Sequence, residues 1–166
     1  MKNDIRTPRI DSINLGNGVE IGLFEISADA SSAEIDIQLA TAVLLFEVVK
    51  SDGHVDRVEV IRVIEILRER FSLSGEQVGR LLEMISDDGS QAPLQSLTDK
   101  IREHWGFAER LLLLENFWVI AIADKIIDER ETKLINELAR LLNLDDNEIS
   151  AARQQARKRL ESGAIK

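Results

Sequence analysis

Residues 42–59 read AVLLFEVVKSDGHVDRVE, and residues 114–131 read LENFWVIAIADKIIDERE. In both stretches an apolar segment is followed by the acidic pattern Asp-x-x-x-Asp-x-x-Glu. The three acids of the first pattern recur at a constant offset of 72 positions, so that Asp52, Asp56 and Glu59 are followed by Asp124, Asp128 and Glu131. Internal duplication produces a constant offset, and two unrelated acidic runs rarely do. We therefore look for function in these two segments.

The chain around this repeat predicts helices from Ser31 to about residue 160, because apolar residues recur there at helical spacing. Helix-start signals divide the region into seven helices, which begin near Ser31 with Glu34, Asp56 with Glu59, Ser74, Pro93, Gly106, Asp128 with Glu131, and Asp145 with Glu148. The first helix, about 32–51, and the fifth, about 107–123, are apolar nearly all round, which is typical of helices in the middle of a bundle.

We therefore predict an all-α fold, a single seven-helix pseudo-symmetric bundle formed by a duplicated unit of helix, acidic turn and helix. Phe46 and Trp118 occupy equivalent positions in the repeat and are expected in its core. The helical domain is assigned to residues 31–166. Residues 1–30 form an N-terminal extension that is partly ordered at best, because Pro8 and several glycines interrupt it. Alternating apolar residues at 19–23 suggest one short strand within it.

Composition excludes several classes of function. The chain of 166 residues has no cysteine, so disulfides, thiolate zinc sites and cysteine nucleophiles are excluded. Its net charge of −9 disfavours nucleic acid as a partner. The apolar runs contain glutamate and are too short for a membrane span, so we expect no direct membrane insertion. No signal peptide is visible, and the cytoplasm is the expected location. The basic stretch of Arg153, Arg157, Lys158 and Arg159 is interpreted as a solvated helix end.

The acidic residues allow two interpretations. As helix caps, the pairs Asp56 with Glu59 and Asp128 with Glu131 need no further role, at about 1 kcal/mol per cap. Asp52 and Asp124 differ, because each ends a buried helix, where the macrodipole disfavours a carboxylate by about 0.3–1 kcal/mol. A compensating positive charge is expected there. It would come from a bound divalent cation or from the nearby basic side chains Lys50, Arg57, Lys125 and Arg130.

A cation site would use the six repeated acids as ligands, with two further helix acids less favoured: Asp52, Asp56, Glu59, Asp124, Asp128, Glu131, then Glu47 and Glu115. Ligands that are all oxygen suit calcium, magnesium or manganese better than copper or zinc. The spacing is not that of an EF-hand loop. If the two turns bind separately, the turn with Gly53 is expected to bind more tightly than the turn with Lys125.

Residues 50–59 and 122–131 resemble the paired acidic turns of TerB-like proteins, the tellurite-resistance family that also supplies a domain to some DnaJ-type co-chaperones. The likeness extends over about residues 33–160 and includes Glu115 to Trp118 and Leu138 to Leu144. The resemblance implies an all-helical pseudo-symmetric domain with a proposed acidic metal-binding surface, in systems that handle tellurite or other chemical stress. Lys125 stands where the family usually has glycine, so a left-handed residue there would be strained.

Three functions remain open from the sequence. The first is a cytoplasmic stress-response domain that binds divalent cations and scaffolds partner proteins. The second is a metal-independent protein-interaction domain whose acidic turns are only caps. The third, an enzyme, is disfavoured, because the chain has no catalytic triad order, phosphate loop or nucleotide fingerprint. We assign no catalytic residues, and the sequence does not indicate an oligomeric state.

Overall fold

The computed structural model describes residues 12–14, 20–22, 32–88 and 93–163. The described residues form two short strands and seven α-helices: β1 (Ser12–Asn14), β2 (Glu20–Gly22), α1 (Ser32–Lys50), α2 (Arg57–Phe71), α3 (Gly75–Asp88), α4 (Leu94–His104), α5 (Phe107–Ile122), α6 (Glu129–Leu141) and α7 (Asp146–Glu161). The predicted all-α fold is confirmed, and the observed helices begin and end close to the predicted positions.

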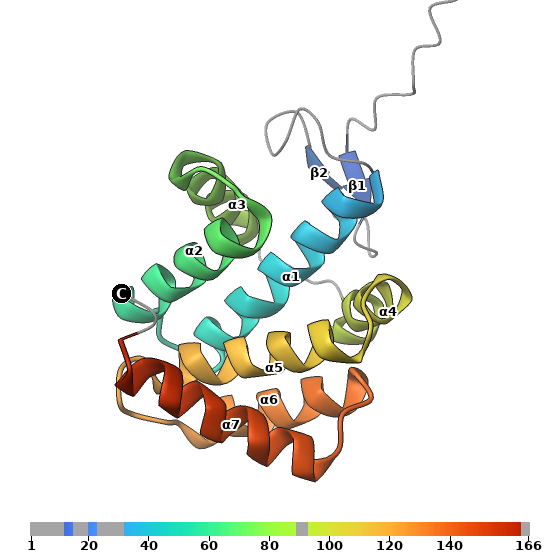
Figure 1. Ribbon diagram of the computed structural model, residues 1–166. Helices are drawn as coiled ribbons and strands as arrows, with labels where there is room; N and C mark the ends of the chain where they lie inside the picture. Colours follow the sequence, from blue (N-terminus) through green and yellow to red (C-terminus); the bar gives the residue numbers. More distant parts are fainter. Residues whose placement is uncertain (1–11, 15–19, 23–31, 89–92, 164–166) are drawn as a thin grey trace, which may run out of the picture.

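Helices α1 and α5 lie in the middle of the bundle and contact each other (Figure 1). Helix α1 also packs on α2, α3, α4 and α6, while α5 packs on α2, α6 and α7. Phe46 is 4% exposed and Trp118 is 1% exposed, so both equivalent aromatics belong to the core as predicted. Helices that are apolar nearly all round can bury their apolar surface only when other helices cover them on several sides. This burial explains their central position.

The helix starts follow the capping signals of the sequence. Asp145 and Glu148 form a reciprocal capping box at the start of α7. Ser74 and Gln77 exchange hydrogen bonds of 2.8 and 3.1 Å before α3, although Gln77 rather than an acid completes this pair. Pro93 is the residue before α4 and not part of its first turn. The capping side chains before α3 and α7 accept hydrogen bonds from amides that the first helical turn leaves without a partner.

Part of the N-terminal extension forms a small antiparallel sheet, in which Ile13 lies opposite Ile21. The centre of the strand expected at residues 19–23 is therefore confirmed as β2. The Ser31 side of the expected first capping box lies outside the described residues. Within the described ranges, no helix combines the length and the apolar character needed to cross a membrane.

Candidate functional site

The two acidic turns have the same local structure. Asp52 Oδ1 accepts a hydrogen bond of 2.8 Å from the His54 amide, and Asp124 Oδ1 accepts one of 2.9 Å from the Ile126 amide. The residue after each aspartate is left-handed, with φ of +84° at Gly53 and +67° at Lys125. The left-handed conformation expected at Lys125 is confirmed, and it costs a residue with a Cβ about 1–2 kcal/mol.

Each turn ends in an aspartate that caps the next helix. Asp56 Oδ1 accepts from the Val58 amide at 2.7 Å, and Asp128 Oδ1 accepts from the Arg130 amide at the same distance. The Asp128 side chain also accepts from the Arg130 guanidinium at 3.2 Å. These bonds from Arg130 lower the pKa of Asp128. Asp56 and Asp128 therefore act as caps, as the first interpretation of the sequence proposed.

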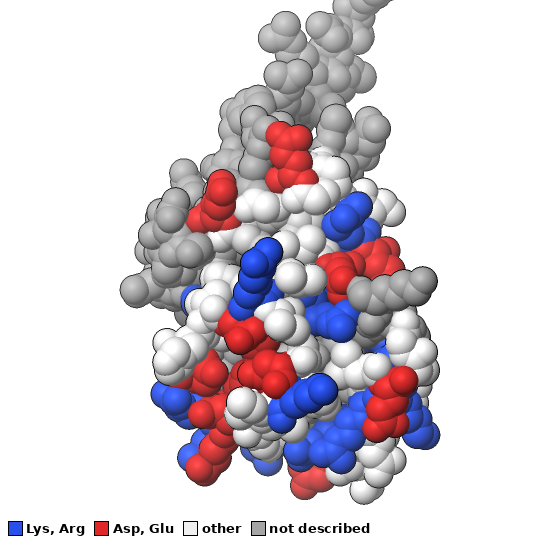
Figure 2. Space-filling model, turned by 90° about the vertical axis from the view of Figure 1, so that its left-hand side faces the viewer, with Lys and Arg blue, Asp and Glu red and all other residues white. Residues whose placement is uncertain are grey.

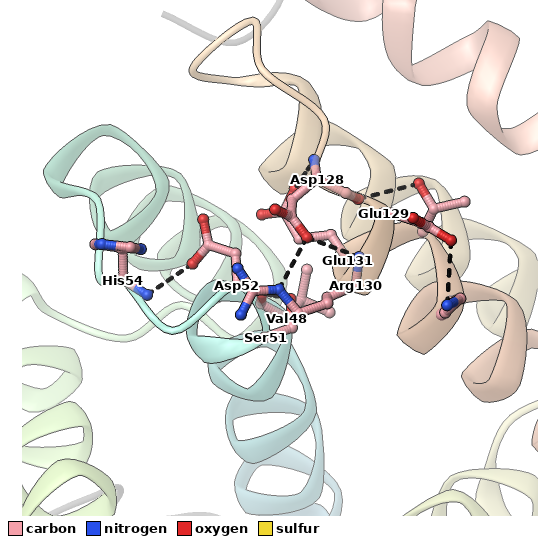
Figure 3. A network of polar contacts seen from close by, with 10 residues as sticks. Val48, Ser51, Asp52, His54, Asp128, Glu129, Arg130 and Glu131 are labelled. Atoms are coloured by element: carbon pink, nitrogen blue, oxygen red, sulfur yellow. Dashed lines mark hydrogen bonds and ion pairs between the residues drawn. The ribbon is translucent and has the colours of Figure 1, made fainter.

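The two turns face each other in the folded chain (Figure 3). Arg130, at the start of α6, lies so close to the first turn that a Cβ added at Gly53 would be 3.7 Å from its Nη1. The hydrogen bond and the charge of Asp128 raise the pKa of Arg130, and the charge of Asp52 adds a smaller contribution. The positive charge expected near Asp52 thus comes from the other repeat. Of the four basic candidates, Arg130 is the one that the structure places against the opposite turn.

Glu59 and Glu131, the third residues of α2 and α6, are each only 1% exposed and meet in the interior. Burial raises the pKa of Glu59 from 4.5 to about 9, assisted by a hydrogen bond with Glu131 and by the charges of Glu131, Asp124 and Asp52. Burial also raises the pKa of Glu131, although hydrogen bonds from Glu59 and from the Asp128 amide oppose the rise. Two carboxylates can only accept, so a bond between them requires one proton. The pair therefore holds a proton at neutral pH.

Capping does not account for Glu59. Glu131 Oε2 accepts from the Asp128 amide at 3.1 Å and completes a capping box. Within the described part of the chain, both oxygens of Glu59 and the Oε1 of Glu131 have no hydrogen-bond donor in their deprotonated forms. A buried polar group without a partner costs about 1–3 kcal/mol. The cap-only interpretation thus explains the second acidic pair but leaves the first pair's glutamate unexplained.

The structure brings four of the eight predicted acids into one site. Asp52 and Asp124 both act electrostatically on the glutamate pair, so each turn supplies one aspartate and one glutamate. The two less favoured acids lie in ion pairs instead: Glu47 with Lys50 at 2.6 Å and Glu115 with Arg159 at 2.8 Å. The sequence suggested two separate turns, whereas the fold joins them through the contact between α1 and α5.

The four acids offer oxygen atoms only, which is the chemistry that a hard divalent cation prefers. The pair of buried glutamates supplies three oxygens without donors, so this part of the site fits a cation. Among the described residues, however, no group of three or more His, Asp or Glu side chains is already arranged as a metal-ligand set. Asp52 and Asp124 each turn an oxygen toward their own turn. Each aspartate keeps a second carboxylate oxygen for a ligand, and binding would require the four acids to draw closer together.

The interpretation of the C-terminal basic stretch as solvated is wrong for two of its residues. Arg159 Nη1 donates to Glu115 Oε1 at 2.8 Å and to Asn116 Oδ1 at 2.9 Å. The Arg153 guanidinium lies 4.9 Å from the centroid of the Trp118 ring. The helical stripe of Ile149, Ala152 and Ala156 continues to position 159, and this spacing was the signal that could have placed Arg159 against α5.

The fold and the site together define a class of protein: an all-helical domain in which two equivalent acidic turns meet over buried carboxyl groups. The sequence model described as tellurite resistance protein TerB matches residues 38–154. Since this match covers more than half of the chain, the protein belongs to the TerB family. No curated protein and no solved structure gave a match.

Proposed function

We propose that this TerB-family protein is a non-enzymatic domain that binds one divalent cation between its two acidic turns and scaffolds partner proteins of a stress response in the cytoplasm. The observation that carries the cation proposal is the buried pair of Glu59 and Glu131, whose inner oxygens have no donor among the described residues other than the proton that the pair shares. Calcium, magnesium and manganese are the candidate ions, because all the offered ligands are oxygen.

Charge supports a cation at this point. In its absence the two glutamates share a proton, and Asp52 and Asp124 add negative charge nearby. A divalent cation would replace the proton and balance several carboxylates at once. Each aspartate could keep its turn hydrogen bond through Oδ1 and offer its second carboxylate oxygen to the cation. Asp56 and Asp128 would stay in place as caps and hold the two turns.

A direct reaction with tellurite is not part of this proposal. Tellurite is an anion, and the chain has a net charge of −9 with four acids at the candidate site. An acidic surface repels an anion. We therefore propose an indirect role, in which the cation-loaded domain supports other proteins.

Thermal unfolding in chelator and then in calcium, magnesium or manganese tests the proposal. A cation at a hundredfold excess over its Kd should stabilise the wild-type protein by about 2.7 kcal/mol. Glu59→Gln should lose this shift. Glu129→Gln is the matched control, because it makes the same change from acid to amide two residues from Glu131, at a side chain that is 82% exposed.

The result also separates the cation proposal from its alternative. If no cation shifts the melting of the wild-type protein, the metal-independent interaction domain takes its place. If Glu129→Gln loses the shift as fully as Glu59→Gln does, the cation binds to surface charge and not at the buried pair.

A further inference from the structure

The molecule has a groove of about 440 Å³ lined by residues of α2, of the end of α5 with the turn that follows it, and of α7: Arg62, Ile122, Ala123, Lys125, Arg157, Leu160 and Glu161. The last turns of α7 lie beside the start of α2 (Figure 1). This position explains how residues nearly a hundred positions apart line one surface. We call this surface the basic groove.

The floor of the basic groove is apolar and its rim is basic. Ile122, Ala123 and Leu160 supply the floor, and Lys125 and Arg157 against Glu161 supply the charge, since Arg62 is ion-paired with Glu65 at 2.8 Å. This charge is opposite in sign to the net charge of the chain, which is −9. On the face shown in Figure 2, basic and acidic side chains are interspersed.

Two exposed apolar side chains neighbour lining residues of the groove along the chain. Val58 lies one helical turn before Arg62, on the same face of α2, and is 43% exposed. Ile126 follows Lys125 and is 72% exposed. Both side chains offer contacts to a ligand longer than the groove itself.

We propose that the basic groove binds an acidic amphipathic helix of a partner protein, with its apolar face on the floor and its carboxylates toward Lys125 and Arg157. A helix laid in a groove is read by apolar anchors three and four residues apart, and the rim charges select its sign. This inference deepens the scaffolding part of the proposed function and does not require the cation.

Two other occupants fit less well. An anionic lipid surface would meet basic side chains here, but it is flat where the groove is concave, and the net charge of −9 opposes its approach. A second copy of this chain is acidic overall, yet it would have to present an acidic apolar helix that matches the groove. Vesicle binding would detect the lipid surface, and sedimentation would detect the second copy.

Fluorescence polarisation with a labelled 18-residue peptide tests the proposal. The peptide places leucines at helical spacing i, i+4, i+7 and i+11 and glutamates on both flanks, and a scrambled peptide of the same composition is its control. We expect the ordered peptide to bind at least tenfold more tightly than the scrambled one, and added salt to weaken it. Equal affinities for both peptides would overturn the proposal.

Variants locate the binding surface. Arg157→Glu and Val58→Ser should each weaken the peptide at least fivefold. Lys158→Glu is the matched control, since it makes the same charge change at an exposed neighbour on α7 that does not line the groove. Equal losses in Arg157→Glu and Lys158→Glu would overturn the groove and indicate attraction to charge alone. Circular dichroism of each variant shows that the fold is intact.

Three further measurements separate the alternatives. Binding to phosphatidylserine vesicles that Arg157→Glu abolishes, without peptide binding, would replace the partner helix by a lipid surface. Dimerisation in sedimentation that Arg157→Glu abolishes would replace it by a second copy. Peptide binding is measured in chelator and in each cation, so that a failed groove and a failed cation site give different results.

Discussion

Glu59 and Glu131 lie 72 positions apart in the chain and occupy the same place in their helices, yet their carboxyl groups meet in one buried site. Each is the third residue of a helix that an aspartate caps. Only Glu131 turns back to bind its own cap. The pair is therefore equivalent in sequence and different in bonding, and that difference leaves Glu59 available for a proton or a cation.

The stability of the protein should fall as the pH rises through neutrality. Burial raises the pKa of Glu59 from 4.5 to about 9, so the folded state keeps a proton that the unfolded state releases. Between these two values the free energy of unfolding should decrease by up to about 1.4 kcal/mol per pH unit. Below pH 4.5 this contribution is complete, and above pH 9 the loss ends. Urea unfolding in chelator from pH 5 to 9 measures the slope.

Glu59→Gln should flatten this profile, because glutamine has the shape of the protonated acid and does not titrate. Glu129→Gln should keep the slope of the wild-type protein. A wild-type profile that runs parallel to that of Glu59→Gln would show that the buried pair does not carry the proton.

The two inner aspartates should contribute equally to the site. Asp52→Asn and Asp124→Asn keep the oxygen that accepts from the turn amide and remove a charge that faces the glutamate pair. In chelator, each should raise the free energy of unfolding by up to about 1 kcal/mol. Each should also weaken cation binding to a similar extent, as titration calorimetry can measure. If only Asp52→Asn weakens cation binding, the two turns bind separately, and the turn with Gly53 binds more tightly.

Lys125→Gly should stabilise the protein by about 0.5–1 kcal/mol. Its φ of +67° is strained for a side chain with a Cβ, by about 1–2 kcal/mol, whereas glycine adds only about 0.5–1 kcal/mol of unfolded-state entropy. Gly53→Ala, at the equivalent position with φ of +84°, is the opposite change and should destabilise by about 0.5–1 kcal/mol. Thermal melting of the two variants checks the signs, and a stabilised Gly53→Ala would contradict the equivalence of the turns.

Trp118→Ala and Phe46→Ala should each destabilise the protein by about 3–5 kcal/mol, because both rings are buried in the central helices. Phe107→Ala on the same helix as Trp118 is the control, since its side chain is 49% exposed. It should cost less than about 1 kcal/mol. Chemical denaturation compares the three, and similar losses in all of them would contradict the central position of α1 and α5.

The sequence by itself determined the helices, their starts and the central pair. Apolar spacing depends on neighbours three and four residues away, and Asp128 with Glu131 or Asp145 with Glu148 caps a helix within one turn. Such local interactions can be predicted from adjacent residues. The left-handed conformation of Lys125 is also local. The resemblance to a known turn predicted it, and a hydrogen bond within the turn accompanies it.

Only the tertiary structure decided which acids meet. Asp52 and Asp56 lie four positions apart, but the packing of α1 against α5 turns Asp52 toward the acids of the second repeat and leaves Asp56 as an exposed cap. The partners of Arg159 were decided in the same way, by the packing of α7 against α5. Long-range contacts depend on the angle and register at which helices pack, and the sequence around each residue does not specify either.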